Sequence, residues 1–181
     1  MVYIILAVVA VIVLYVISTY NSLVQLRNKV RNQWSQIDVV LKNRADLIPN
    51  LVETVKGYAG HEKETLEAVI SSRNKYLTAN TPEEAMAASG EISGALSKLF
   101  ALTEAYPDLK ANTNFLDLQA KLSETEDKIR YARQFYNDAA NKFNDKVEMF
   151  PSNIVAGMFK FEMAKLFEAS EADKEVPKVQ F

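Results

Sequence analysis

The sequence lacks cysteine altogether and contains one histidine, five glycines and five prolines in 181 residues. Without cysteine the chain can form neither disulfide bonds nor thiolate metal sites, and it offers no cysteine nucleophile. A single histidine excludes sites that need several imidazole ligands. The scarcity of glycine and proline leaves few turns and is typical of a chain built from long helices.

The sequence also has no excess of charge of one sign. Lysine and arginine together number 21 and aspartate and glutamate 23, which gives a formal net charge of -2. A chain without a basic excess neutralises few phosphates, so general nucleic-acid binding is disfavoured. No cofactor, metal or small-molecule motif is evident, and 181 residues suit one compact domain. Composition therefore predicts an architecture rather than an activity.

The most definite feature is an apolar run at residues 2–17, after which the first charged side chain is Arg27. At ~1.5 Å per residue the run forms about 24 Å of helix, slightly short of a ~30 Å hydrocarbon core, and Tyr20 with its apolar neighbours extends it. No basic residue precedes the run and no cleavage site follows it, which disfavours a signal peptide. A core helix of a small soluble domain would need a polar face. We therefore expect a transmembrane anchor at residues 1–26.

The distribution of positive charge predicts how this anchor is oriented. Nothing basic precedes the span, whereas five basic residues follow it closely: Arg27, Lys29, Arg31, Lys42 and Arg44. Under the positive-inside rule the N-terminus then lies outside and the helical domain in the cytoplasm. The expected protein is a single-pass cell membrane protein, and its lack of cysteine agrees with a reducing compartment.

Beyond the anchor, apolar residues recur at alternating steps of three and four, which indicates helices packed along heptad-like seams. The first seam consists of Leu23, Leu26, Val30, Trp34, Ile37, Leu41, Ala45 and Ile48. The longest seam covers residues 115–150 and ends before Pro151. The seams predict an all-α fold, an antiparallel bundle of four main long helices at residues 27–170, followed by a loose tail at 171–181.

The first seam continues past Pro49 through Val52, Val55 and Ala59, and this uninterrupted phase favours a kink. A proline removes a hydrogen-bond donor and clashes with the preceding turn, so the helix must kink or stop there. The chain either kinks there within one helix or makes a tight turn at residues 46–49. We favour the turn, because the later segments have lengths that suit antiparallel neighbours. A second helix would then cover residues 49–79.

Capping signals predict the remaining helices. Thr81, followed by a proline and two glutamates, is typical of the N-cap of a helix at residues 82–106. Small residues in this helix permit close backbone approach: Ala88, Ser89, Gly90, Ser93, Gly94 and Ser97. Composition predicts a loop at 107–114. Ser152 predicts the N-cap of a short fifth helix at 152–169.

Several stretches resemble the LemA family. Residues 34–69 read WSQIDVVLKNRADLIPNLVETVKGYAGHEKETLEAV, and the second half contributes EAYPDLKAN, NFLDLQAKLSETEDKIRYARQFYNDAANKFN, the Phe150-Pro151 pair and the closing PKVQF. The resemblance covers almost the whole chain, with its motifs in order. It implies a membrane-anchored, largely extramembrane antiparallel helical bundle of bacteria, and it implies no biochemical activity.

His61 is the one candidate for phosphotransfer. Its pairing with Glu62 on a predicted helix is similar to the phospho-accepting helices of two-component kinases. Those helices usually continue with an apolar residue, a basic one and a turn containing proline, whereas this chain continues with Lys63, Glu64 and Thr65. No second histidine completes the H-E-x-x-H motif of a zinc protease. A solvated histidine is therefore favoured, with a phosphorelay element as the alternative function.

Carboxylates cluster at Glu124, Glu126 and Asp127, which invites comparison with di-iron bundles. Such sites need two E-x-x-H motifs, and the sequence contains none. The spacing instead predicts surface ion pairs of Glu126 with Arg130 and of Glu124 with Lys128. We predict no catalytic, metal-binding or cofactor-binding residues.

Two other surfaces are candidates for recognition. Residues Arg130, Arg133, Asn137, Asn141 and Asn144 form one polar stripe, either a ledge for a partner helix or peptide or, as we favour, bonds to neighbouring helices of the bundle. The predicted last helix carries a mixed set of methionine, phenylalanine and aliphatic residues: Val155, Met158, Phe159, Phe161, Met163, Leu166 and Phe167. An exposed remainder of this set would contact a partner or the membrane.

For that last set we favour self-association or docking to another membrane protein over lipid capture, because Lys160 and Lys165 are offset by Glu162 and Glu168. The function predicted from the sequence is a non-enzymatic scaffold at the membrane surface that binds a protein partner or itself.

Overall fold

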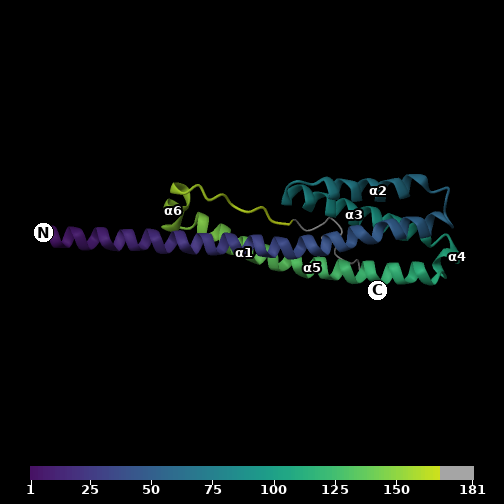
Figure 1. Ribbon diagram of the computed structural model, residues 1–181, viewed down its shortest axis with the longest axis horizontal. Coiled ribbons are helices and arrows are strands. Elements are labelled where there is room, and N and C mark those ends of the chain that lie inside the picture. Colours follow the sequence, from purple (N-terminus) through teal and green to yellow (C-terminus); the bar gives the residue numbers. More distant parts are fainter. Residues whose placement is uncertain (168–181) are drawn as a thin grey trace, which may run out of the picture. The chain divides into compact units, whose positions relative to one another are not determined.

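The computed structural model describes residues 1–167, and within them it contains α-helices, turns and one extended stretch but no β-strand (Figure 1). The predicted all-α class is confirmed. The helices are α1 (Val2–Lys56), α2 (Lys63–Thr78), α3 (Pro82–Thr103), α4 (Pro107–Lys110), α5 (Thr113–Glu148) and α6 (Ser152–Met158). The tail expected at 171–181 lies outside the described residues.

The described chain forms two compact units. Unit 1 comprises Met1–Gln36 and Ala132–Leu166, and unit 2 comprises Ile37–Tyr131 together with Phe167. The end of α1, all of α2, α3 and α4, and the start of α5 therefore belong to unit 2. The first 36 residues, the end of α5, and α6 belong to unit 1.

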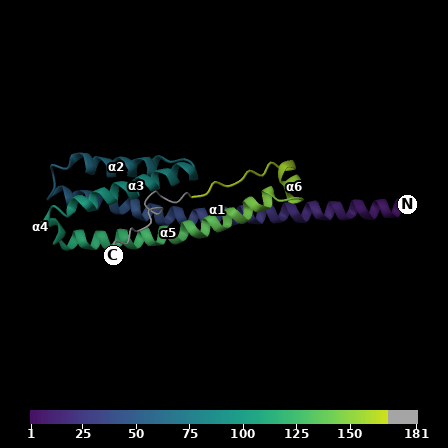
Figure 2. The ribbon, with the colours of Figure 1, turned by 180° about the vertical axis from the view of Figure 1, so that it is seen from behind.

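The core of unit 2 is built from the predicted apolar seams. In both views α2 and α3 lie side by side, joined by a short connection (Figures 1 and 2). Fully buried aliphatic and aromatic side chains come from every helix that contributes to the unit, and they include Ile37, Leu41, Ile48, Leu51, Val55, Val69, Ile92, Leu99, Leu109, Phe115 and Ile129. The seams thus identified the buried faces of α1 and α5, whereas no seam was predicted for α2 and α3.

The cap of α3 forms as predicted. The Thr81 hydroxyl accepts a hydrogen bond from the Glu84 backbone N–H at 3.2 Å, and the Glu84 carboxylate accepts one from the Asn80 N–H at 2.8 Å. This reciprocal pair satisfies two donors at the helix start, and Pro82 stands at the first helical position, where its missing N–H costs nothing.

The predicted turn at residues 46–49 is wrong, because α1 continues through Pro49 to Lys56. Ile48 and Leu51, on either side of the proline, are fully buried, so packing along the seam offsets the lost backbone hydrogen bond. The chain turns instead at residues 57–62, which contain Gly57 and Gly60. A Cβ atom at Gly60 would stand 3.3 Å from the Lys56 carbonyl oxygen, so a larger residue crowds this turn.

The longest seam forms one helix, as predicted, although α5 begins and ends two residues earlier than the expected 115–150. The Asn112 side chain accepts from the Phe115 N–H at 3.0 Å and so caps its start. The loop expected at 107–114 is partly wrong, because Pro107–Lys110 form α4, whose Leu109 is fully buried.

In unit 1, α1 packs against the end of α5 and against α6. The rings of Trp34 and Tyr136 meet edge to face with centroids 6.1 Å apart. Buried side chains lie on all three helices: Leu23, Val30, Tyr136, Ala139, Ala140, Phe143, Val155 and Ala156. Residues 2–15 of α1 are exposed and apolar, and by length and composition this helix contains a segment suited to crossing a membrane.

The helix α6, which was predicted as a fifth helix at residues 152–169, is much shorter than expected. It ends at Met158 because Lys160 adopts a left-handed φ of 53°. The Phe161 N–H donates to the Ala156 carbonyl at 2.9 Å, and the Lys160 N–H donates to the Gly157 carbonyl at 3.2 Å. These two bonds satisfy the last carbonyls in a Schellman motif. Ser152 is the first helical residue rather than the N-cap.

Candidate functional site

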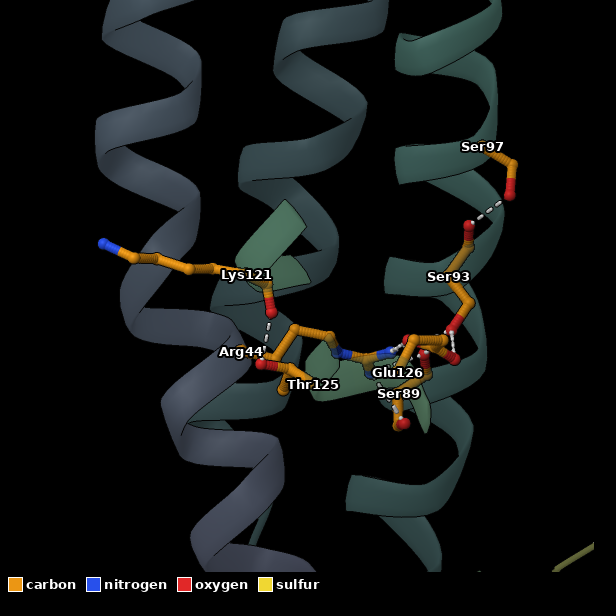
Figure 3. A network of polar contacts seen from close by, with 7 residues as sticks. All are labelled: Arg44, Ser89, Ser93, Ser97, Lys121, Thr125 and Glu126. Atoms are coloured by element: carbon orange, nitrogen blue, oxygen red, sulfur yellow. Dashed lines mark hydrogen bonds and ion pairs between the residues drawn. The ribbon is translucent and has the colours of Figure 1, made fainter. Parts of the chain in front are cut away.

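The guanidinium of Arg44, which is fully buried on α1, is the centre of a polar network in unit 2. It reaches two other helices (Figure 3). One amino group donates to the Ser93 hydroxyl at 2.9 Å and to the Glu126 carboxylate at 2.6 Å. The other donates to the Ser89 hydroxyl and carbonyl at 2.8 Å and 2.9 Å. The network therefore joins α1, α3 and α5 in the interior of unit 2.

The small residues of α3 make room for this arginine. Ser89 and Ser93 stand one turn apart, and the Ser93 hydroxyl also donates to the second oxygen of Glu126 at 3.1 Å. The close approach predicted for the neighbouring glycines is not found, because a Cβ atom at Gly90 or Gly94 would meet nothing within 4 Å. The serines, rather than the glycines, explain why this stretch of α3 faces α1 and α5.

Glu126 does not form the surface pair predicted from spacing. Its carboxylate points to Arg44, and Arg130 pairs with Asp127 at 2.8 Å instead. The other predicted pair is confirmed, with 2.7 Å between Glu124 and Lys128. The Lys128 ammonium, through its hydrogen bond and its charge, lowers the pKa of Glu124. A buried cation attracts Glu126 more strongly than an exposed one, since less water screens it.

Sequence reasoning treated Arg44 only as one of five basic residues near the anchor. The signal that identifies it as buried is its place between Leu41, Ala45 and Ile48 on the first seam, all of which are buried. A long basic side chain on a seam, together with paired serines on another predicted helix, indicates an internal polar network.

A second polar contact of unit 2 links α2 to α1. The Tyr76 hydroxyl donates to the Asp38 carboxylate at 3.0 Å, and the Arg73 guanidinium donates to the Ala45 carbonyl at 2.8 Å. Burial, followed by the hydrogen bond to Asp38, raises the pKa of Tyr76 well above its ordinary value of 10.0. The phenol therefore stays a neutral donor at any physiological pH.

His61 lies exposed in the turn between α1 and α2, so the predicted placement on a helix is wrong. Its neighbour Glu62 accepts a hydrogen bond from the Tyr106 hydroxyl at 2.9 Å, which raises the pKa of that phenol. The Tyr58 hydroxyl accepts from the Asn112 amide at 2.9 Å. The polar groups on either side of His61 therefore hold the turn to the loop around α4.

The carboxylates considered for a metal do not converge. Within residues 1–167, no group of three or more histidine, aspartate or glutamate side chains is placed to hold a metal ion. Glu124 and Asp127 each pair with a basic residue on their own helix, and Glu126 faces Arg44.

Asn144, the last member of the polar stripe on α5, bonds to the backbone of a distant segment. In unit 1, the Asn144 amide donates to the Ala164 carbonyl at 2.9 Å and accepts from the Ala164 N–H at 2.8 Å. The Tyr136 hydroxyl donates to the Lys165 carbonyl at 2.9 Å. We call residues 161–166 the docked segment, because this extended stretch lies against α5 in the way a bound peptide would.

An aromatic side chain anchors the docked segment. The Phe161 ring is buried, with the Tyr20 and Phe143 ring centroids at 5.8 Å and 6.3 Å and the Arg27 guanidinium 5.1 Å above its face. The two interpretations of the polar stripe required bonds to a partner or to a neighbouring helix. Asn144 bonds instead to an extended segment of the same chain.

Among the exposed apolar side chains of the described residues, two groups form candidate contact surfaces, one in each unit. On α2, Ile70 and Leu77 are 40% and 48% exposed and seven residues apart, so they share the outer face of that helix. A shallow depression of about 400 Å³ runs along this face, lined by Glu67, Ile70, Ser71, Asn74, Lys75 and Thr78. The second surface surrounds α6 in unit 1.

Comparison with known proteins gives consistent relatives. Residues 33–181 match the model of the LemA family. The chain is 31% identical over 158 residues to Protein LemA of Metamycoplasma hominis. The alignment covers 85% of the chain and 71% of that protein. The chain is 25% identical over 179 residues to Magnetosome protein MamQ 2 of Paramagnetospirillum magneticum. It is 23% identical to Magnetosome protein MamQ of Magnetospirillum gryphiswaldense, and it spans 66% of the length of each of these two.

Proposed function

Because the chain belongs to the LemA family, we propose that it is a membrane-tethered, non-enzymatic helical scaffold that binds a protein partner at the membrane surface. The resemblance read from its motifs is thereby confirmed as family membership. The family match and the apolar start of α1 support a membrane-associated protein. The scaffold role, the partner and the orientation are our proposal.

The observation that carries the proposal is the continuity of α1. Its residues 2–15 are exposed and apolar, and the same helix then buries Thr19, Leu23 and Val30 in unit 1 without a break. A flexible linker would let the domain move freely about its anchor. A continuous helix instead holds unit 1 at one membrane surface and restricts the directions in which it meets partners.

We place the N-terminus outside the cell and the domain in the cytoplasm, following the basic residues after the span. The cysteine-free chain allows a direct test with single-cysteine variants. In intact cells, a membrane-impermeant maleimide should label Val2→Cys and leave the exposed Thr78→Cys unlabelled until the cells are opened. Labelling of Thr78→Cys from outside would reverse the orientation.

We assign the outer face of α2 to the partner. Ile70 and Leu77 supply apolar contacts one heptad apart, and Ser71, Asn74 and Thr78 supply hydrogen-bonding groups beside them. This arrangement suits a helix of another protein laid along α2, because such helices present anchors at the same spacing.

A photo-crosslinking amino acid tests this surface in the native membrane. Placed at Ile70 or Leu77, it should form a discrete crosslinked product. Placed at Leu116, which is 46% exposed on α5 in the same unit, it should form none. Equal products at all three positions, or none at Ile70 and Leu77, would contradict the assignment.

A further inference from the structure

The second exposed apolar surface is a corner of unit 1 formed by the connection between α5 and α6, by α6 itself and by its C-cap residue Phe159. We call it the apolar corner and define it by Met149, Phe150, Ile154, Met158 and Phe159. These side chains are between 49% and 80% exposed. Five large exposed apolar side chains within residues 149–159 are the kind of feature that marks an interaction site in a soluble domain.

The apolar corner lies beside α1 close to the end of the predicted membrane span. The Tyr20 ring stands 4.6 Å from that of Phe159, measured between centroids. Burial of α1 within unit 1 begins with Thr19, just past the exposed apolar residues. Both ribbon views place α6 against the early part of α1 (Figures 1 and 2).

The sequence of α1 determines where a bilayer would end on it. The uncharged apolar run ends at Ile17, and the first charged residue is Arg27. The edge of the hydrocarbon core falls between them, because charged side chains are costly inside it. Tyr20 lies within this interval, and tyrosine is enriched at that depth. Phe159, which contacts Tyr20, therefore lies at the same depth.

We propose that the apolar corner inserts into the bilayer leaflet next to the domain and forms a second membrane contact beside α1. The inference rests on α1 spanning the membrane, and it adds that unit 1 itself touches lipid. Methionine suits this role because its flexible side chain adapts to irregular acyl chains, and phenylalanine is common on surfaces that insert at the interface. A second contact restricts rotation of the domain about the anchor.

The charges around the apolar corner favour lipid tails over headgroups as the ligand. Lys160 is offset by Glu148 and Glu162, so the corner has no basic excess for anionic lipids. Insertion should therefore be equal in zwitterionic and anionic bilayers and insensitive to salt. The other occupant that the test distinguishes is a second copy of the chain.

Tryptophan quenching by brominated phosphatidylcholine tests the proposal with the full chain in vesicles. The single native tryptophan is removed by Trp34→Phe, and Phe150→Trp then places the probe at the apolar corner. Phe135→Trp is the matched control, because Phe135 is 61% exposed on α5 in the same unit but away from the corner. Leu14→Trp reports whether α1 is in the bilayer.

We expect brominated lipid to quench the emission of Leu14→Trp and Phe150→Trp and to leave that of Phe135→Trp unchanged, with the same result in zwitterionic and anionic vesicles. Quenching at position 14 without quenching at position 150 would overturn the proposal and leave the anchor intact. Emission at position 150 that ignores bromine but shifts to the blue as the protein-to-lipid ratio rises would also overturn it, in favour of a second copy. Absence of quenching at all three positions would refute the anchor as well.

Discussion

Removal of the Glu126 carboxylate should destabilise the protein far more than its half-exposed position suggests. The side chain of Arg44 is 1% exposed and that of Glu126 is 43% exposed. In Glu126→Ala the guanidinium stays buried but loses its carboxylate partner, and the Ser93 hydroxyl loses an acceptor. The cost then comes from the cation left behind rather than from the side chain removed.

The magnitude follows from two limits. Breaking a buried ion pair by removing one partner costs about 3–5 kcal/mol, and a hydrogen bond to a charged group contributes about 1.5–3 kcal/mol. Because Glu126 is 43% exposed, water reaches the vacated space and the lower range applies. We expect a loss of about 2 kcal/mol, which lowers the melting temperature by about 4–8 °C for a chain of this size.

A double-mutant cycle isolates the cause. In an Arg44→Met background no buried cation remains, so Glu126→Ala should change the free energy of unfolding by less than about 0.5 kcal/mol. Urea unfolding of the full chain in detergent, followed by the loss of helical circular dichroism, measures each corner of the cycle. Glu124→Ala is the matched control on the same helix, because its pair with Lys128 is exposed, and it should leave the midpoint unchanged.

An equal cost of Glu126→Ala in the native protein and in the Arg44→Met background would refute this account. Glu126 would then contribute through packing or helix propensity, and its carboxylate would not compensate the buried charge.

Three further expectations concern other contacts. Because the pKa of Tyr76 is raised in the folded state, the neutral phenol stabilises the protein fully below pH 10, and this stabilisation is lost as the pH rises further. In Tyr76→Phe the free energy of unfolding, measured in denaturation curves, should therefore fall less steeply above pH 10. Thr81→Ala removes the α3 cap and should cost about 1 kcal/mol in urea unfolding, whereas Thr81→Ser should restore most of it. Asn144→Leu should speed hydrogen exchange at the Ala164 amide, with little change at the buried Ala139 amide. Unaltered exchange at Ala164 would show that the docked segment is not bound to α5 in solution.

The buried faces of α1 and α5 and the start of α3 were predictable because they depend on periodicity and on local caps. The seam of α5 and the Thr81 cap of α3 were placed correctly from spacing and residue type alone. Pro49 was misjudged because a local rule was applied without the tertiary packing of Ile48 and Leu51, which keeps the helix continuous.

The polar contacts were harder to predict, because residue type does not reveal a partner far away in sequence. Arg44 meets Glu126 across 82 positions, and spacing along α5 favoured Arg130 as the partner instead. The end of α6 depends on Lys160 adopting a conformation that glycine or asparagine usually provides, so no composition signal marked the start of the docked segment.

Gly90 and Gly94 occupy exposed sites on α3 where an added methyl group would touch no neighbour. Each glycine destabilises a helix by about 1 kcal/mol relative to alanine. The helix α3 is therefore less stable than it would be with alanine at both positions. Partial melting of α3 would release the serines that hold the Arg44 guanidinium, and so would loosen three helices at once. Replacement of both glycines by alanine should therefore make local opening of unit 2 rarer without altering its interior. The pair thus offers a way to adjust the local stability of this part of the protein.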